Sequence, residues 1–353
     1  MERAEIEQWL RETDDKRLKT LWDIADKVRN DHVGSAVYLR GLVEFSNNCA
    51  RQCAYCGLHA GNRKVNRYRM TEDEIVACAH KAVEFGYGTV VLQSGEDRAY
   101  KRDDLSSIIR RIKTETPLAV TLSLGEREDA ELLAWREAGA DRYLLRFETS
   151  NPDLYAIIHP NLAGKPSDRL AMLRRMRDMG YEIGSGIMVG IPGQTYADIA
   201  RDIETFRELD LDMIGIGPYL SHPDTMLGQR REELTAPGGE QAPSGELMTY
   251  KAVALTRIAL PEANIPSTTA LATVNRAKGR ELGLRRGANI MMPNITPVKY
   301  RKDYQIYPGK ACIMEDAAAC HGCMLMRIEA LGRTVGSGRG DSPHYKNANL
   351  APA

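Results

Sequence analysis

The stretch AVYLRGLVEFSNNCARQCAYC, residues 36–56, places a strand-like segment directly before three cysteines in C-x3-C-x2-C spacing. Cys49, Cys53 and Cys56 can hold three irons of a cubane cluster, whereas a closed ferredoxin-type site takes four cysteines. The fourth iron would then be open to a small molecule. A structural zinc site favours two C-x2-C pairs, and the polar neighbours of these cysteines disfavour three inert core thiols. The spacing therefore predicts a 4Fe-4S cluster that binds and reduces a small molecule, as S-adenosylmethionine (SAM) chemistry requires, with Tyr55 beside that molecule as an apolar wall.

Composition limits the class of protein. The 353 residues include 48 basic and 48 acidic side chains and are 43% hydrophobic. We therefore expect one large core and neither a nucleic-acid nor a membrane surface. The charged N-terminus is not expected to be a secretory signal, and no apolar run approaches the ~18 residues of a membrane span. The seven cysteines are odd in number and grouped, which favours metal binding in a reducing compartment over disulfides. We expect a cytoplasmic protein in which Cys78, on the apolar side of a helix, belongs to the core.

Short apolar strands alternate with helices along most of the chain. Strands are expected at 36–46, 89–94, 118–124, 142–148, 182–191, 213–217, 264–269 and 288–293, with helices between them. Thr71 and Glu74 form a capping box that opens the first of these helices. Eight repeats favour an α/β fold whose parallel sheet closes as a (β/α)8 TIM barrel. An open doubly wound sheet is the alternative, because pattern alone seldom fixes closure.

The predicted barrel spans residues 35–300. Two amphipathic helices in residues 1–34 are expected to cap one end of it, and residues 301–333 are expected to form a C-terminal extension. Residues 334–353, which contain GSGRGDSP, are predicted to be a flexible tail. The Gly-, Pro- and charge-rich segment 228–245 is predicted to be a mobile surface loop.

Polar residues gather where the expected strands end, which is where barrels build their active sites. They are Gln93, Ser94, Gly95, Glu96, Thr121, Ser123, Arg146, Glu148, Thr268 and Thr269. SAM carries an ammonium, a carboxylate and a sulfonium, so its pocket needs acceptors and a cation. Gly95 and Glu96 offer acceptor oxygens beside a close backbone approach. Arg169 is either the partner of the SAM carboxylate or a solvated helix arginine paired with Asp168. The turn VGIPGQT, residues 189–195, could hydrogen-bond adenine.

A second group of cysteines lies outside the eight repeats. Cys312, Cys320 and Cys323 stand in C-x7-C-x2-C spacing. So tight a grouping favours a second metal site over coincidence. His321 could supply a fourth ligand, or it is merely exposed.

Nine segments carry a family resemblance from about residue 20 to residue 333. They are YLRGLVEFSNNCARQCAYCGL, NRYRMT, VVLQSGED, VTLSLGE, GADRYLLRFET, MVGIPGQT, DMIGIGPYLSHPDT, IPSTTA and YPGKAC. Together they resemble the HydE family, radical-SAM maturases of di-iron (FeFe) hydrogenase. The resemblance implies that Ser123, Glu148 and Arg169 contact SAM, with Gly95 and Glu96 alongside. It also implies a cavity lined by the catalytic set Ser94, Thr121, Arg146, Met213, Thr268, Thr269, Tyr304 and Tyr307.

The same resemblance implies a substrate and partners. The family is understood to act on a cysteine-bound iron complex with carbon monoxide and cyanide, Fe(CO)2(CN). HydG makes this complex, and the di-iron subcluster is loaded onto HydF. Reduced ferredoxin or flavodoxin would supply electrons. Some members bind an accessory cluster, 2Fe-2S or 4Fe-4S, at the second cysteine group, and others lack those cysteines. The accessory cluster is therefore expected to be dispensable for the main reaction.

One departure and three alternatives remain open at the level of sequence. Phe147 stands where many members have histidine, so a polar contact is lost there or was never catalytic. Methylornithine synthase and biotin synthase share the barrel and the cysteine spacing. Biotin synthase needs a sacrificial cluster inside the barrel, and no spare cysteine stands at a strand end. A non-enzymatic iron-sulfur carrier would need neither Glu96, Arg169 nor an enclosed polar cavity.

Overall fold

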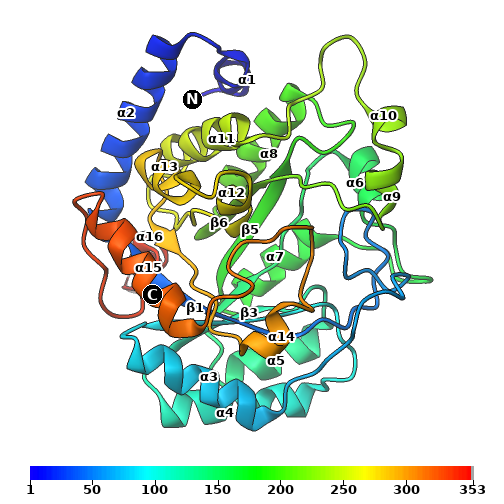
Figure 1. The fold of residues 1–353 in the computed structure, drawn as a ribbon, viewed down its shortest axis with the longest axis vertical. Helices are drawn as coiled ribbons and strands as arrows, with labels where there is room; N and C mark the ends of the chain where they lie inside the picture. Colours follow the sequence, from blue (N-terminus) through cyan, green and yellow to red (C-terminus); the bar gives the residue numbers. More distant parts are fainter. Residues whose placement is uncertain (351–353) are drawn as a thin grey trace.

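Seven parallel strands form one curled sheet (Figure 1). The structure is a computed structural model that describes residues 1–350 of the chain and the side chains of residues 1–346. The strands are β1 (Tyr38–Ser46), β2 (Thr89–Ser94), β3 (Ala119–Ser123), β4 (Arg142–Leu144), β5 (Glu182–Val189), β6 (Met213–Pro218) and β7 (Ile290–Met291). Their order in the sheet is β6-β5-β4-β3-β2-β1-β7. Almost every strand residue is buried, as in a parallel sheet that is covered on both faces.

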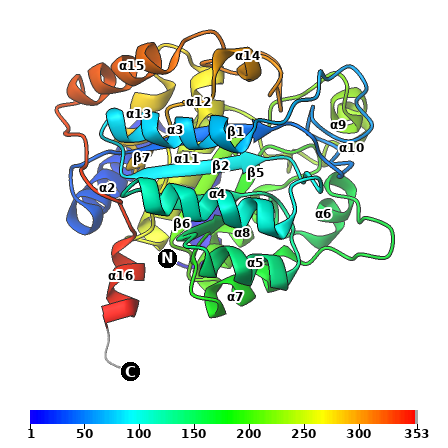
Figure 2. The same ribbon diagram turned by 90° about the horizontal axis from the view of Figure 1, so that it is seen from below.

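Helices pack around the outside of this sheet (Figure 2). They are α3 (Glu72–Glu84), α4 (Arg102–Glu115), α5 (Asp129–Glu137), α6 (Pro152–Ile158), α7 (Arg169–Asp178), α8 (Tyr196–Glu208), α11 (Glu246–Ala259), α12 (Thr269–Val274) and α13 (Gly279–Arg285). The predicted capping box opens α3, because the Thr71 amide donates to the Glu74 carboxylate (2.9 Å) and the Glu74 amide donates to the Thr71 hydroxyl (3.3 Å). Within the described residues, no helix is long and apolar enough to cross a membrane.

A short extended segment, residues 264–267, replaces the strand predicted at 264–269. The amide of Ile214 donates to the carbonyl of Asn264, and the amide of Ser267 donates to the carbonyl of Ile290, both at 2.9 Å. The segment therefore joins β6 and β7 through isolated pairs. Pro266, in its middle, has no amide hydrogen and cannot extend a ladder. The prediction of a TIM-like parallel α/β fold is confirmed, but the described sheet has seven strands rather than eight.

The two N-terminal helices were predicted to cap one end of the barrel. In the structure they lie against other helices instead. α1 (Arg3–Arg11) packs on α8, and α2 (Asp15–Val33) packs on α11 (Figure 1). Leu10 and Leu21 are buried in these contacts. The Lys251 ammonium of α11 donates to the carbonyl of Leu10 (2.8 Å). The apolar stripe of each helix is thus covered by α8 and α11, which leaves the end of the barrel to another segment.

That segment is residues 334–342, which we call the plug, and the prediction of a flexible tail is wrong for it. The amide of Val37 donates to the carbonyl of Thr334 (2.8 Å), and the amide of Gly336 donates to the carbonyl of Val37 (2.9 Å). The plug therefore enters beside the start of β1, at the end where the strands begin. α16 (Pro343–Leu350) follows it. Residues 351–353 of the predicted tail lie outside the described residues.

A buried layer of charges fixes the plug. The fully buried Arg142 guanidinium contacts the carboxylates of Glu182 and Asp341. The Arg40 guanidinium, also buried, donates to the carbonyl of Gly340 (2.9 Å). A buried charge that loses its partner costs several kcal/mol. Pairing within this layer outweighs the Gly-rich composition on which the prediction of disorder rested.

The segment 228–245 lies on the surface, as predicted, but it is partly ordered by local structure. It contains the end of α9 (Met226–Gln229) and α10 (Arg231–Leu234). The Gln241 side-chain amide donates to the carbonyls of Ile191 (3.0 Å) and Gln194 (3.2 Å). These bonds anchor the far end of the segment next to β5.

We predict that Gly88→Ala destabilises the fold through the plug. A Cβ at Gly88 would lie 1.8 Å from the carbonyl oxygen of Gly338, so the backbone on one side must move. We expect a loss of about 1–3 kcal/mol in the free energy of unfolding, measured by urea denaturation. Gly322→Ala is the matched control, because a Cβ there meets nothing within 4 Å and alanine favours its helix. Equal stability of the two variants would contradict the placement of the plug.

Candidate active site

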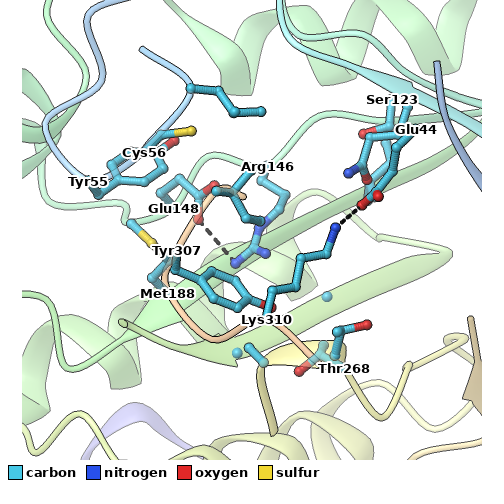
Figure 3. Close-up of a pocket in the computed structure, with 18 of the residues that line it drawn as sticks. Glu44, Tyr55, Cys56, Ser123, Arg146, Glu148, Met188, Thr268, Tyr307 and Lys310 are labelled. Atoms are coloured by element: carbon cyan, nitrogen blue, oxygen red, sulfur yellow. Dashed lines mark hydrogen bonds and ion pairs between the residues drawn. The ribbon is translucent and has the colours of Figure 1, made fainter. Parts of the chain in front are cut away.

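A cavity of about 340 Å³ lies at the end of the sheet where the strands finish. Four residues at or next to the ends of β2 to β5 contribute to its wall: Ser94, Ser123, Leu144 and Met188. The opposite wall comes from residues 304–310, which follow α14 (Val298–Arg301) and carry Tyr304, Tyr307 and Lys310. Figure 3 shows side chains from these segments and from the cysteine region around one space. This is the end at which the sequence predicted the chemistry.

The cysteine loop, residues 47–62, is held against the end of β2. A Cβ at Gly95 would lie 2.3 Å from the carbonyl oxygen of Asn48 and 2.7 Å from the Cβ of Cys49. Only glycine permits so close an approach. Cys49, Tyr55 and Cys56 line the cavity, whereas Cys53 does not.

One guanidinium gathers both ends of the cysteine loop. Arg67 donates to the carbonyls of Asn47 (2.5 Å) and Leu58 (2.9 Å) through one nitrogen. Its other terminal nitrogen donates to the carbonyls of His59 (2.9 Å) and Asn62 (3.2 Å). The loop has little regular structure of its own, so these four bonds supply partners that a helix or sheet would otherwise provide.

The three thiols suit an iron-sulfur cluster. The amides of Arg51 and Glu96 donate to Sγ of Cys49 (3.5 and 3.4 Å), and hydrogen bonds to the sulfurs are a feature of cluster sites. Burial raises the pKa of Cys56 to about 12 and also raises the pKa of Cys49 and of Cys53. The free thiols therefore keep their protons at neutral pH, and metal ligation is what would convert them to thiolates.

A buried polar network that the sequence did not reveal lies behind the cysteine loop. The Arg51 guanidinium donates to Glu96 (2.7 Å) and Glu126 (2.5 Å), and Arg169 donates to Glu126 (2.9 Å). His159 lies 3.0 Å from the same carboxylate through Nε2. Burial alone would raise the pKa of Glu126, but the hydrogen bond with His159 and the charge of Arg169 outweigh it and lower that pKa. Two carboxylates thus balance two guanidinium groups.

This network reaches a cluster ligand through His159. Its Nδ1 lies 3.1 Å from Sγ of Cys53. Burial lowers the pKa of His159, so the ring is neutral near pH 7. His159 follows α6 directly, and Glu126 follows Gly125 after β3. Neither position carries a local sequence signal, because the contact depends on two loops that meet only in the fold.

Four of the five residues expected to contact SAM line the cavity: Gly95, Ser123, Glu148 and Arg169. The fifth, Glu96, does not line it, because its carboxylate is turned to Arg51 and also accepts from the amide of Glu126 (2.9 Å). Glu148 has a φ of 64°, a conformation that non-glycine residues rarely adopt and that is frequent at functional sites. The strained backbone aims its carboxylate into the cavity (Figure 3).

The structure excludes one of the two interpretations of Arg169, the solvated helix arginine paired with Asp168. Its side chain is buried, and its guanidinium donates to the carbonyl of Arg146 (2.6 Å) rather than to Asp168. Asp168 instead caps α7 by accepting from the amide of Ala171 (2.9 Å). The turn at 189–195 contributes no residue to the cavity wall, since only Met188 of that strand end does so.

The remaining part of the cavity holds two ion pairs. The Arg146 guanidinium lies 3.1 Å from the Glu148 carboxylate, and Lys310 contacts Glu44, as the dashed lines in Figure 3 show. Both Glu44 and Lys310 are buried, and the sequence analysis missed them. The predicted residues Ser94, Thr268, Thr269, Tyr304 and Tyr307 share this space. Cations, carboxylates and hydroxyls therefore surround a volume that could hold a small polar molecule.

Three residues singled out by the sequence lie elsewhere. Thr121 is two residues below Ser123 on the same face of β3 and does not line the cavity. Met213 lies deeper still, with its sulfur 2.9 Å from a guanidinium nitrogen of Arg40 in the plug layer. Phe147 faces the helices and packs on Phe206, with ring centroids 5.4 Å apart. No polar contact is lost from the cavity at Phe147.

In the second cysteine group, Cys312 precedes α15 (Ala317–Glu329) and Cys320 and Cys323 lie within that helix; none of the three lines the cavity. A hydrogen bond from Cys320 lowers the pKa of Cys312 to about 6, and Arg280 contacts the Cys312 sulfur at 3.8 Å. Arg327 donates to Sγ of Cys323 (3.3 Å). The lowered pKa of Cys312 favours its thiolate, the form that binds metal.

The His321 ring contacts two aromatic side chains, Phe85 and Tyr87. Its ring stacks on Phe85 at 4.6 Å, and its Nδ1 lies 3.0 Å from the Tyr87 hydroxyl. Its role as a fourth ligand receives no support from these contacts. Cys78 lies buried in α3, as predicted.

Comparison with known proteins agrees with this geometry. Residues 43–206 match the radical SAM superfamily. The chain is 47% identical over 319 residues, 90% of its length, to the [FeFe] hydrogenase maturase subunit HydE of Thermotoga maritima, covering 87% of that protein. It is 28% identical over 279 residues, 78% of its length, to 3-methylornithine synthase of Methanosarcina acetivorans, covering 75% of that protein.

Solved structures share the fold. Methylornithine synthase (PylB) superposes with a TM-score of 0.80 at 23% identity, over 99% of this chain and 96% of that one. HydG, a maturase of the [FeFe]-hydrogenase, superposes with a TM-score of 0.75 at 18% identity, over 94% of this chain and 72% of that one. At these identities the similarity concerns architecture alone, and the substrate must be argued from the site.

Proposed function

This chain belongs to the HydE family of [FeFe] hydrogenase maturases and is a radical-SAM enzyme, and from that premise we propose that it processes a cysteine-bound Fe(CO)2(CN) complex during maturation of the hydrogenase H-cluster. The observation that carries the proposal is the cavity itself. Two cluster cysteines form one side, and paired cations and carboxylates with two threonines form the other. We further propose that HydG supplies the complex and that HydF receives the product.

Cys49, Cys53 and Cys56 would hold a [4Fe-4S] cluster in this proposal. When bound, the cluster would supply the electron for reductive cleavage of SAM to methionine and a 5'-deoxyadenosyl radical. The protein's own contribution is position. Gly95 admits the cysteine loop at the end of β2, and Tyr55 lines the cavity together with Cys49 and Cys56.

Arg169 and Glu148 would orient SAM. A guanidinium has five N–H donors, and Arg169 uses three nitrogens on Glu126, Arg146 and His159 while it lines the cavity. A terminal N–H on Arg169 can therefore bind a carboxylate without loss of its present partners. The carboxylate of Glu148 offers acceptors for hydroxyl or ammonium groups.

Arg146, Thr268 and Thr269 would bind the substrate. They present a guanidinium and two hydroxyls to the same space, which suit cyanide and an amino-acid carboxylate. Lys310 and Glu44 add a second cation and a second carboxylate, so both charged groups of an amino acid find partners. An apolar substrate has no charged group to pair with Arg146, Glu148, Lys310 or Glu44. It would therefore make no polar contact with either ion pair of the cavity.

The first test concerns the cluster. We expect anaerobically reconstituted protein with dithionite and SAM to yield 5'-deoxyadenosine and methionine, and Cys53→Ala to abolish both. The reason is that two thiolates do not hold the three irons that leave a single iron open. Product analysis by chromatography, together with iron content, measures the outcome. Normal turnover by Cys53→Ala would refute the ligand assignment.

The second test concerns the accessory cysteines, which we propose hold an accessory 2Fe-2S or 4Fe-4S cluster. Cys320→Ser with Cys323→Ser should lower iron content but retain SAM cleavage and hydrogenase maturation, because these residues do not line the cavity. Iron analysis and in vitro maturation give the two readouts. Lost maturation in a folded double variant would show that this second cluster takes part in the reaction.

The third test concerns the substrate. Removal of the Arg146 charge would also strip Glu148 of its partner, so Arg146→Lys is the sharper variant. It keeps the charge but loses bidentate geometry, which should weaken turnover of the iron complex about 10- to 100-fold while dithionite-driven SAM cleavage changes little. Carbonyl loss followed by infrared spectroscopy measures turnover. Rearrangement of lysine by the wild-type protein would instead favour a methylornithine synthase activity.

A further inference from the structure

A strained turn follows β4, at the residue whose carboxylate enters the cavity (Figure 3). Glu148 has a φ of 64°, and the amide of Thr149 donates to the carbonyl of Phe147 (2.8 Å). A hydrogen bond that spans one residue of positive φ makes a γ-turn of the rare, strained kind. Such strain persists only where the surrounding structure holds it. The groups behind this turn therefore determine where the Glu148 carboxylate points.

The carboxylate of Asp202, in α8, holds the chain directly after the turn. Its Oδ1 accepts from both the amide (2.5 Å) and the hydroxyl (2.6 Å) of Ser150. The next residue is tied to the same helix, because the Asn151 side-chain amide donates to the Asp198 carboxylate (2.9 Å). Two acids one turn apart on α8 thus fix the two residues that follow the turn.

The same carboxylate reaches the neighbouring strand end through Gln194. Oδ2 of Asp202 accepts from the Gln194 side-chain amide (3.3 Å), which also donates to the carbonyl of Met188 (3.1 Å). The Gln194 side-chain oxygen accepts from the amides of Gly190 (2.7 Å) and Ile191 (3.2 Å). Met188 lines the cavity. Asp202 therefore stands behind two adjacent strand ends, β4 and β5, that both contribute to the cavity wall.

Burying Asp202 is unfavourable in itself. Its side chain is fully buried, and its hydrogen-bond donors within residues 1–346, from Ser150 and Gln194, are all uncharged. Burial raises the pKa of Asp202 to about 7; the bonds from Ser150 oppose the rise, and the charge of Asp198 adds to it. An apolar side chain would suit this position better if it only had to fill space. The donors that the carboxylate gathers explain its presence better than packing does.

We propose that Asp202 is a positioning residue for SAM, which holds the strained turn in the conformation that presents the Glu148 carboxylate to the ligand. The inference rests on the proposed function, which assigns Glu148 to SAM. Within the described residues, Oε2 of Glu148 accepts no hydrogen bond, so it can accept one from a hydroxyl or ammonium group. Asp202 itself does not line the cavity and acts through the turn.

The variant to test is Asp202→Asn, which keeps the volume of the side chain and removes its charge. Neutral hydrogen bonds are about half as strong as charged ones. Whichever way the new amide is turned, its NH2 group faces a donor, either the amide of Ser150 or the side chain of Gln194. Thr205→Val is the matched control, because Thr205 is buried in the same helix and its hydroxyl donates to the Arg201 carbonyl (2.9 Å) within that helix.

Hydrogen exchange of the cluster-free protein tests the anchor without any activity. We expect the amides of residues 148–151 and 190–191 to exchange about tenfold faster in Asp202→Asn than in wild type, because their acceptors are weakened or displaced. The control should match wild type in these segments, and the amides of β1 should exchange at the wild-type rate in both variants. Unchanged exchange at residues 148–151 in Asp202→Asn would overturn the proposal.

SAM kinetics test the route through Glu148. In dithionite-driven cleavage we expect Asp202→Asn to raise KM for SAM about tenfold and to change kcat less than about twofold, with Thr205→Val at wild-type values. Glu148→Gln should also raise this KM. Adding Asp202→Asn to Glu148→Gln should raise it no further, because the two substitutions remove one and the same contact. A further tenfold rise in the double variant would overturn the route through Glu148.

The same measurements separate this proposal from the function on which it rests. Failure of wild type to cleave SAM with dithionite would overturn the proposed function, and hydrogen exchange would still decide whether Asp202 holds the turn. A wild-type KM in Glu148→Gln would overturn the assignment of Glu148, and the role of Asp202 toward SAM with it. A wild-type KM in Asp202→Asn, beside a raised KM in Glu148→Gln, would overturn the role of Asp202 alone.

Discussion

The active site depends on the approach of an irregular loop to the end of a parallel sheet. Gly95 admits the backbone of Asn48 at a distance that no side chain would tolerate, and Arg67 binds carbonyls at both ends of the loop. The loop cannot satisfy its own backbone groups, so these contacts determine where the thiols lie. Parallel strands finish at one edge, and the same edge therefore receives the polar residues of β2, β3 and β4.

The inner cavity couples its two halves through one ion pair. Glu148 belongs to the SAM half by family resemblance, and Arg146 belongs to the half that we assign to substrate, yet the two lie 3.1 Å apart. Arg146 also accepts a hydrogen bond from Arg169 through its carbonyl. A ligand in either half must therefore alter the charge felt in the other. Any such coupling is reciprocal, so each ligand would change the affinity for the other by the same factor.

Local patterns predicted much of this protein, and long-range contacts account for what they missed. The cysteine spacing, the Thr71 capping box and most strands follow from neighbouring residues. Glu44 and Lys310 are separated by 266 positions and meet only because residues 304–310 cross the cavity. The plug was predicted to be disordered from its Gly-rich composition. That composition does not reveal that Asp341 pairs with the buried Arg142, which is distant in the sequence. The strand predicted around Pro266 is reduced to isolated bridges because proline has no amide hydrogen to donate. Hydrophobic periodicity does not detect that loss.

The plug also has a consequence for how the chain is made. Residues 334–342 follow every strand in the sequence, yet Asp341 and Gly340 are partners of Arg142 and Arg40 on β4 and β1. During synthesis the ribosome releases all seven strands before these partners appear. Until the plug arrives, Arg142 has Glu182 as its carboxylate partner but lacks Asp341, and Arg40 lacks the carbonyl of Gly340. The buried charge layer can therefore be completed only after a segment that follows all seven strands has been synthesised.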